Sequence, residues 1–252
     1  MTNPISITVV IPCYNSERHL KRCLVSVLNQ SYENYKVVAY NNESTDSTGE
    51  ILSKYAEKYK DKLSVIDIEN IYQNSYREAF DDSFNNCDTE YITFVASDDY
   101  IDKDYLQKVS KIISPRKNQI KCLQSGISIM LDKYKQADQI YKYSTVNQFK
   151  KLCMQRSPVN TPSVFYHKDI YEYLEPKAHI DSRKELRGAE DYDMFCNLAE
   201  NDILIYACPV VLGYNYQLHE GQCTWNVHSE KQFFDYDRMI QSYWGERWNI
   251  RE

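Results

Sequence analysis

The stretch YITFVASDDYID, residues 91–102, organises the rest of the chain. It is an apolar run that ends in two adjacent carboxylates, and a buried parallel strand delivers acidic groups in this way at its carboxyl end. Asp98 and Asp99 are therefore candidate ligands of a divalent metal. The same two side chains have a second interpretation, as caps of a helix that begins near Asp102. The remainder of the chain decides between the two.

Strand and helix patterns alternate four times in the first 113 residues. This alternation calls for an α/β fold, with a mostly parallel, Rossmann-like central sheet flanked by helices and with ligands at the carboxyl ends of the strands. The predicted strands lie at residues 7–12, 36–40, 63–68 and within 91–102, followed by 120–131, a short strand and helix in 164–174, and one or two strands in 203–218.

Apolar faces predict the helices. Asn15 or Ser16 is the expected N-cap of the first helix. The expected inner faces are Leu20, Cys23, Leu24, Val27 and Leu28; then Ile51, Leu52, Tyr55 and Tyr59; then Tyr76, Ala79, Phe80 and Phe84; and, in a helix beginning near Glu190, Tyr192, Phe195, Leu198 and Ala199.

Composition excludes several classes of protein. A chain of 252 residues with 42% apolar content can fill a core, and its net charge of -6 argues against a nucleic-acid partner. The first residues lack a basic leader, and no apolar run approaches the roughly 18 residues of a membrane span. Eight scattered cysteines without a Cys-x-x-Cys pair argue against zinc. We expect a cytoplasmic protein.

Five motifs in order resemble the signature of family 2 glycosyltransferases, which are inverting enzymes of the GT-A fold that use nucleotide-sugar donors. The motifs are VVIPCYN (9–15), NNESTDST (41–48), SDD (97–99), EDYD (190–193) and YQLHEGQCT (216–224). The resemblance implies one GT-A domain over residues 1–225, with a nucleotide-binding half at 1–113, an acceptor half at 114–225, and a separate aromatic helical tail at 226–252.

The resemblance places the base and ribose of the donor, expected to be UDP-linked, against Pro12, Tyr14, Asn15 and Asn42. Tyr14 has two interpretations, because it could stack on the base or pack on the first helix. Asn41 and Asn42 stand where the family has two aspartates. An amide keeps an acceptor oxygen and adds a donor, which leaves the base preference open.

The family's Asp-x-Asp motif falls on Ala96, Ser97 and Asp98, so its first aspartate is absent here. The resemblance makes Asp98 the expected ligand of Mn²⁺ or Mg²⁺, with Ser97 beside the donor and His219 approaching the metal or the diphosphate. Asp99 then belongs to the surroundings of the metal or caps the following helix. A purely structural role for His219 is the alternative.

The resemblance also assigns the reacting groups. Asp191 is the expected general base and Glu190 the residue that holds an acceptor hydroxyl, since inversion needs a carboxylate on the face opposite the leaving group. An acidic helix N-terminus favoured by the helix dipole is the alternative for both. Arg77 is expected to face the diphosphate, unless it is an ordinary solvated helix residue.

The tail is expected to form a helix with Phe233, Tyr236, Ile240 and Tyr243 on one face. Its charged residues sum to -1, whereas membrane-surface helices are usually basic, so packing on the domain or on a second subunit is favoured over contact with the inner membrane surface. The expected partners are a nucleotide-sugar donor and a glycan or lipid-linked glycan acceptor.

There are three rival functions. A catalytically degenerate protein that binds a nucleotide or glycan would account for Asn41, Asn42 and Ala96, but retention of Asp98, Asp191 and His219 argues against it. A nucleotidyltransferase or a dinucleotide-binding dehydrogenase needs a glycine-rich phosphate loop after the first strand, and residues 12–20 contain no glycine.

Overall fold

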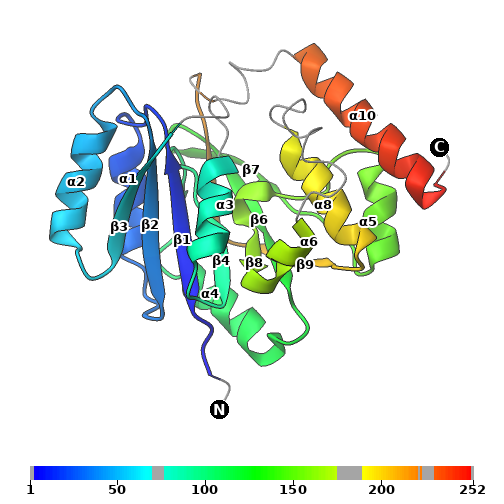
Figure 1. Ribbon diagram of the computed structural model, residues 1–252, viewed down its shortest axis with the longest axis horizontal. Helices are drawn as coiled ribbons and strands as arrows, with labels where there is room; N and C mark the ends of the chain where they lie inside the picture. The colour runs from blue at the N-terminus through cyan, green and yellow to red at the C-terminus, as the bar shows by residue number, and fades with distance from the viewer. Residues whose placement is uncertain (1–2, 70–76, 175–188, 221, 223–229, 251–252) are drawn as a thin grey trace.

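The computed structural model describes residues 3–69, 77–174, 189–220, 222 and 230–250. These residues form a nine-stranded sheet in the order β3-β2-β1-β4-β8-β6-β9-β5, with β7 paired to β6 (Figure 1). The strands are β1 Ile7–Cys13, β2 Tyr35–Asn42, β3 Leu63–Ile68, β4 Tyr91–Phe94, β5 Tyr100–Ile101, β6 Cys122–Leu131, β7 Tyr134–Gln139, β8 Phe165–His167 and β9 Ile205–Leu218. The helices are α1 Leu20–Leu28, α2 Thr48–Lys58, α3 Arg77–Asn86, α4 Tyr105–Ile113, α5 Val146–Cys153, α6 Tyr171–Leu174, α8 Glu190–Glu200 and α10 Glu230–Trp248, with short 3-10 helices η1 Ser114–Arg116, η2 Thr161–Ser163 and η3 Lys168–Ile170.

The first four strands are parallel to one another, which confirms the predicted α/β fold. β1 lies between β2 and β4, and β3 pairs with the far edge of β2. The second half of the sheet is mixed, because β8 runs antiparallel to β4 and β6 antiparallel to β8, while β9 is parallel to β6. The carboxyl ends of β1, β2 and β4 therefore open on the same edge, where ligands of such sheets bind.

Helices cover both faces of the sheet, so the central strands β1 and β4 are almost entirely buried. In β1, Val9 and Ile11 belong to one apolar cluster and Val10 to the other. The first cluster includes the predicted inner face of α1, all five residues of which are buried. Tyr55 of α2 and Tyr59, which directly follows α2, pack at its margin. The predicted face of α8 is buried in the second cluster, which lies on the side of α5 and α10 (Figure 1).

Two local expectations were wrong, and two elements were missed. α1 begins at Leu20 without a side-chain cap, since Ser16 Oγ instead contacts Tyr14 and Ser97. The helix expected near Asp102 begins at Tyr105, because residues 100–101 first form the short strand β5 against β9. β7 and α5 were not predicted at all. Five of the six residues of β7 are exposed, so its sequence has no apolar alternation to mark it.

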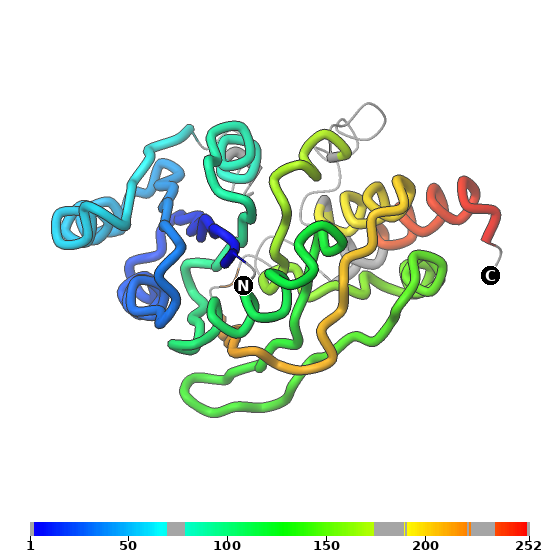
Figure 2. The backbone as a smooth tube through the Cα atoms, turned by 90° about the horizontal axis from the view of Figure 1, so that it is seen from below, coloured from blue at the N-terminus to red at the C-terminus, as the bar shows by residue number. Residues whose placement is uncertain are grey.

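The tail helix α10 packs on the domain beside α8 and α5, as Figures 1 and 2 both show. Ile240 and Trp244 are each 2% exposed, and the Trp244 indole donates to Asp193 Oδ1 of α8 at 2.7 Å. Tyr243, expected on the inner face, is 38% exposed. Among the described helices, including this one, none has the length and apolar character needed to cross a membrane.

Gly126 of β6 allows β6 and β9 to approach closely at an irregular register. A methyl group there would lie 2.7 Å from Ile140 and 3.0 Å from Val211, inside normal contact distance. We expect Gly126→Ala to lower the free energy of unfolding by about 1–3 kcal/mol in urea denaturation. Gly49→Ala is the matched control, since its methyl meets only Asn41 at 3.5 Å, and a helical alanine should be neutral or stabilising. Equal losses in both variants would contradict this.

Candidate active site

The loop after β1 is joined to the loops after β2 and β4. Asn15 adopts a left-handed backbone with φ 45°, and its side-chain oxygen accepts from the backbone N–H of Thr45 at 2.8 Å. Ser16 Oγ lies 2.7 Å from Ser97 Oγ, which connects the same loop to the turn after β4. Three segments that are distant in sequence thus form one polar floor at the carboxyl edge of the sheet.

The predicted donor residues lie on this floor. Pro12 is within β1, and the Tyr14 side chain that follows is 39% exposed, so it does not belong to the core. Asn42 is 5% exposed at the end of β2. The neighbouring Asn41 donates from Nδ2 to Asp67 Oδ1 at 2.8 Å, which orients its amide. Sequence reasoning missed Asp67, although in-register pairing of β2 with β3 places it directly beside Asn41.

The turn after β4 separates the roles of the two aspartates. Asp98 Oδ2 lies 2.9 Å from His219 Nε2, so two of the predicted ligands are in contact. Asp99 is fully buried and accepts from the Tyr214 hydroxyl and from the Gln217 backbone N–H, each at 2.8 Å. Neither aspartate caps α4, and the capping interpretation is wrong. Asp99 instead fastens the turn to β9.

Burial controls the electrostatics of this cluster. Burial, and then the Asp98 carboxylate, raise the pKa of Asp99 well above its ordinary value, and the two donors offset part of this effect. Burial and Asp99 likewise raise the pKa of Tyr214 well above its ordinary value. Arg22 supplies positive charge, since its guanidinium donates to the Asp98 carbonyl and to Gln217 Oε1, both at 2.8 Å. The sequence pattern did not identify Arg22, Tyr214 or Gln217.

His219 is held from two sides. Its ring lies 4.5 Å, centroid to centroid, from the ring of His19 at the start of α1, while Asp98 contacts its Nε2. Burial, and then the neighbouring His219, lower the pKa of His19.

Asp98 and His219 fit a divalent cation. Asp98 Oδ2 and His219 Nε2 lie 2.9 Å apart, close enough that one cation could be held by both side chains. Among the described residues there is no group of three or more His, Cys, Asp or Glu side chains that could hold a metal. Phosphate oxygens and water would have to complete the shell, as is common for Mg²⁺ and acceptable for Mn²⁺.

Asp191 lies in a separate cluster at the start of α8. Its Oδ1 accepts from the Tyr192 backbone N–H at 2.8 Å, and its Oδ2 accepts from the Thr161 hydroxyl at 2.5 Å. Glu190 and Arg77 begin α8 and α3, but their side chains lie outside the described part of the chain. Sequence reasoning missed Thr161, which no motif marks.

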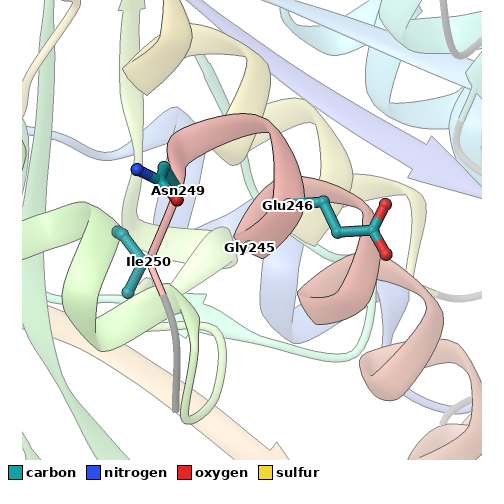
Figure 3. Close-up of a pocket in the computed structure, with 4 residues that line it drawn as sticks. All are labelled: Gly245, Glu246, Asn249 and Ile250. Carbon is teal, nitrogen blue, oxygen red and sulfur yellow. The ribbon is translucent and has the colours of Figure 1, made fainter.

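A pocket at the end of α10 is unrelated to these clusters. It is lined by Gly245, Glu246, Asn249 and Ile250 (Figure 3), none of which is a predicted site residue. The candidate active site therefore rests on the side-chain clusters and not on this pocket.

Comparison with known sequences decides the family. The profile of "Glycosyl transferase family 2" matches residues 8–174, about two thirds of the chain. The chain belongs to glycosyl transferase family 2. The resemblance inferred from the five motifs is thereby confirmed.

Relatives in this family include the glycosyltransferase GlyA of Streptococcus pneumoniae, 38% identical over 107 residues, which are 42% of this chain and 15% of GlyA. A poly(ribitol-phosphate) beta-glucosyltransferase of Bacillus spizizenii is 38% identical over 105 residues, 40% of this chain and 16% of that protein. The crystal structure of S. aureus TarS 1–349 in complex with UDP-GlcNAc superposes with a TM-score of 0.69 at 21% identity, covering 94% of this chain and 65% of TarS. This likeness confirms the GT-A fold, while the chain spans less than two thirds of each of these proteins.

Tyr214→Phe removes one of the two donors to the buried Asp99 carboxylate. We expect it to lower the free energy of unfolding by about 1–3 kcal/mol, the cost of leaving a buried acceptor short of a partner. Urea denaturation at neutral pH measures this. Tyr134→Phe, at a side chain 67% exposed, should change stability by less than about 0.5 kcal/mol. An unchanged denaturation midpoint for Tyr214→Phe would show that Asp99 does not depend on the tyrosine.

Proposed function

We propose that this chain is an inverting, metal-dependent glycosyltransferase that moves a sugar from a UDP-linked donor to a hydroxyl of a glycan or glycolipid acceptor. The observation that carries the proposal is the 2.9 Å contact between Asp98 Oδ2 and His219 Nε2, which are 121 positions apart in sequence. The crystal structures of TarS with UDP and with UDP-GlcNAc support a UDP donor. The name of TarS, a poly(ribitol-phosphate) beta-N-acetylglucosaminyltransferase, supports a glycan acceptor.

In this proposal residues 1–113 hold the nucleotide and residues 114–225 the acceptor. Tyr14 stacks on the base, since its ring is exposed at the edge of the polar floor. Asn15 and Asn42 contact the ribose and base.

The metal site consists of Asp98 and His219, with Ser97 and Arg77 facing the diphosphate. When bound, Mn²⁺ or Mg²⁺ supplies positive charge that offsets the charge on the departing nucleoside diphosphate. Asp99 keeps Asp98 in place by tying the turn to β9.

Asp191 acts as the general base. Its carboxylate takes the proton from the acceptor hydroxyl as that oxygen bonds to the anomeric carbon and the bond from this carbon to the diphosphate oxygen breaks. Attack from the face opposite the leaving group inverts the anomeric configuration. Glu190 holds a hydroxyl of the acceptor.

A degenerate binding protein is the second candidate. The amides of Asn41 and Asn42 and the missing carboxylate at Ala96 favour it, because each departs from the acidic pattern of the family. Both candidates bind the nucleotide-sugar donor, but only the glycosyltransferase releases UDP from it.

Asp191→Asn tests the choice. We expect release of UDP from UDP-GlcNAc or UDP-glucose in the presence of Mn²⁺, with a rate about 10²–10⁴-fold lower in Asp191→Asn and with donor affinity unchanged. Asp202→Asn is the control, because Asp202 follows the other end of α8 with a positive φ that asparagine also tolerates. Absence of UDP release from the unaltered protein would favour the binding protein, and normal release by Asp191→Asn would refute the base.

A further inference from the structure

The hydroxyl of Thr161 makes a short contact with the proposed base. Thr161 Oγ1 donates to Asp191 Oδ2 at 2.5 Å across 30 residues of sequence, and both side chains are half-buried. The other carboxylate oxygen accepts from the Tyr192 backbone N–H. Each oxygen of Asp191 therefore has a donor that limits rotation of the carboxylate.

The residue before Thr161 is fixed by buried hydrogen bonds. Asn160 is 2% exposed, and its Nδ2 donates to the carbonyls of Ser125 and Gln139, both at 3.0 Å. Its side-chain oxygen accepts from Gln139 Nε2 at 2.9 Å, and its backbone N–H donates to Gln124 Oε1 at 2.8 Å. Asn160 is thus tied to β6 and β7 through all of its side-chain polar atoms.

The residues after Thr161 are fixed in the same way. Ser163 is fully buried, and its hydroxyl lies 2.9 Å from the carbonyls of both Ser125 and Asn160. The Thr93 hydroxyl of β4 donates to the Val164 carbonyl at 2.9 Å. Pro162 restricts the backbone between Thr161 and Ser163. Thr161 therefore lies within a segment that buried hydrogen bonds hold against the sheet on both sides. Its hydroxyl links this segment to Asp191.

We propose that Thr161 is a positioning residue for the glycosyl-transfer reaction, whose hydroxyl holds the Asp191 carboxylate in one orientation relative to the sheet. This rests on the proposed role of Asp191 as base. A donor to a carboxylate also favours its ionised form, the form that accepts a proton. Residues 160–163 contain no charged group, and substitution of Thr161 by valine or serine changes no charge in this segment.

The test compares Thr161→Val with Thr161→Ser in Mn²⁺-dependent hydrolysis of UDP-GlcNAc or UDP-glucose. Valine keeps the shape but not the donor, so we expect kcat to fall about 10–100-fold with KM within about twofold, and the acid limb of the kcat profile to move to higher pH. Serine restores the donor and should restore both. Thermal unfolding checks that each variant is folded, and Thr161→Ala replaces valine if it is not.

Thr93→Val is the matched control, because it removes a hydroxyl that holds the same segment without touching Asp191. It should lower stability and leave the acid limb in place. A Thr161→Val enzyme with unchanged kcat and acid limb overturns the inference, as does a Thr93→Val enzyme with the same shift. If either of these two results is obtained and Asp191→Asn is inactive, only the role of Thr161 is refuted, and the proposed role of Asp191 as base still stands. An active Asp191→Asn would instead refute the base itself.

Discussion

The proposed donor and metal site depends on the hydrogen bonds of one buried carboxylate, that of Asp99. It accepts from Tyr214 and from the backbone of Gln217, and thereby fastens the turn after β4 to the last strand of the chain. Because Asp98 precedes it and His219 follows β9, this bond brings the two proposed metal ligands together. A buried carboxylate without donors costs free energy of folding. The hydrogen bonds of Asp99 therefore stabilise the fold and at the same time keep Asp98 beside His219.

A second polar cluster plays the same part for the proposed base. Asn160 and Ser163 fix the segment that contains Thr161, and Thr161 in turn contacts Asp191. Asp191 lies on α8, and Asp193 of the same helix accepts a hydrogen bond from the Trp244 indole of α10. This bond anchors α8 to the tail helix. The proposed base therefore lies on α8, while the proposed metal ligands lie in the turn after β4 and directly after β9, and hydrogen bonds between distant segments hold each of them.

Sequence patterns identified most elements with a buried face, although α5, which buries Phe149 and Cys153, was missed. Local periodicity predicted the alternation of strands and helices and the inner faces of α1 and α8. Short sequence motifs indicated the family. Contacts such as Asn41 with Asp67, Tyr214 with Asp99, and Thr161 with Asp191 depend on strand register and on packing between distant segments, which no local pattern encodes. β7 left no periodic signal because most of its residues are exposed.

We propose that Asp98 and His219 bind the metal that holds a UDP-linked donor. Isothermal titration of UDP with and without Mn²⁺, in the unaltered protein and in Asp98→Asn, measures the contribution of this metal to donor binding. Mn²⁺ should strengthen UDP binding by on the order of tenfold or more, and Asp98→Asn should abolish this gain. UDP affinity that is equal with and without Mn²⁺, or binding of purine nucleotides alone, would contradict it.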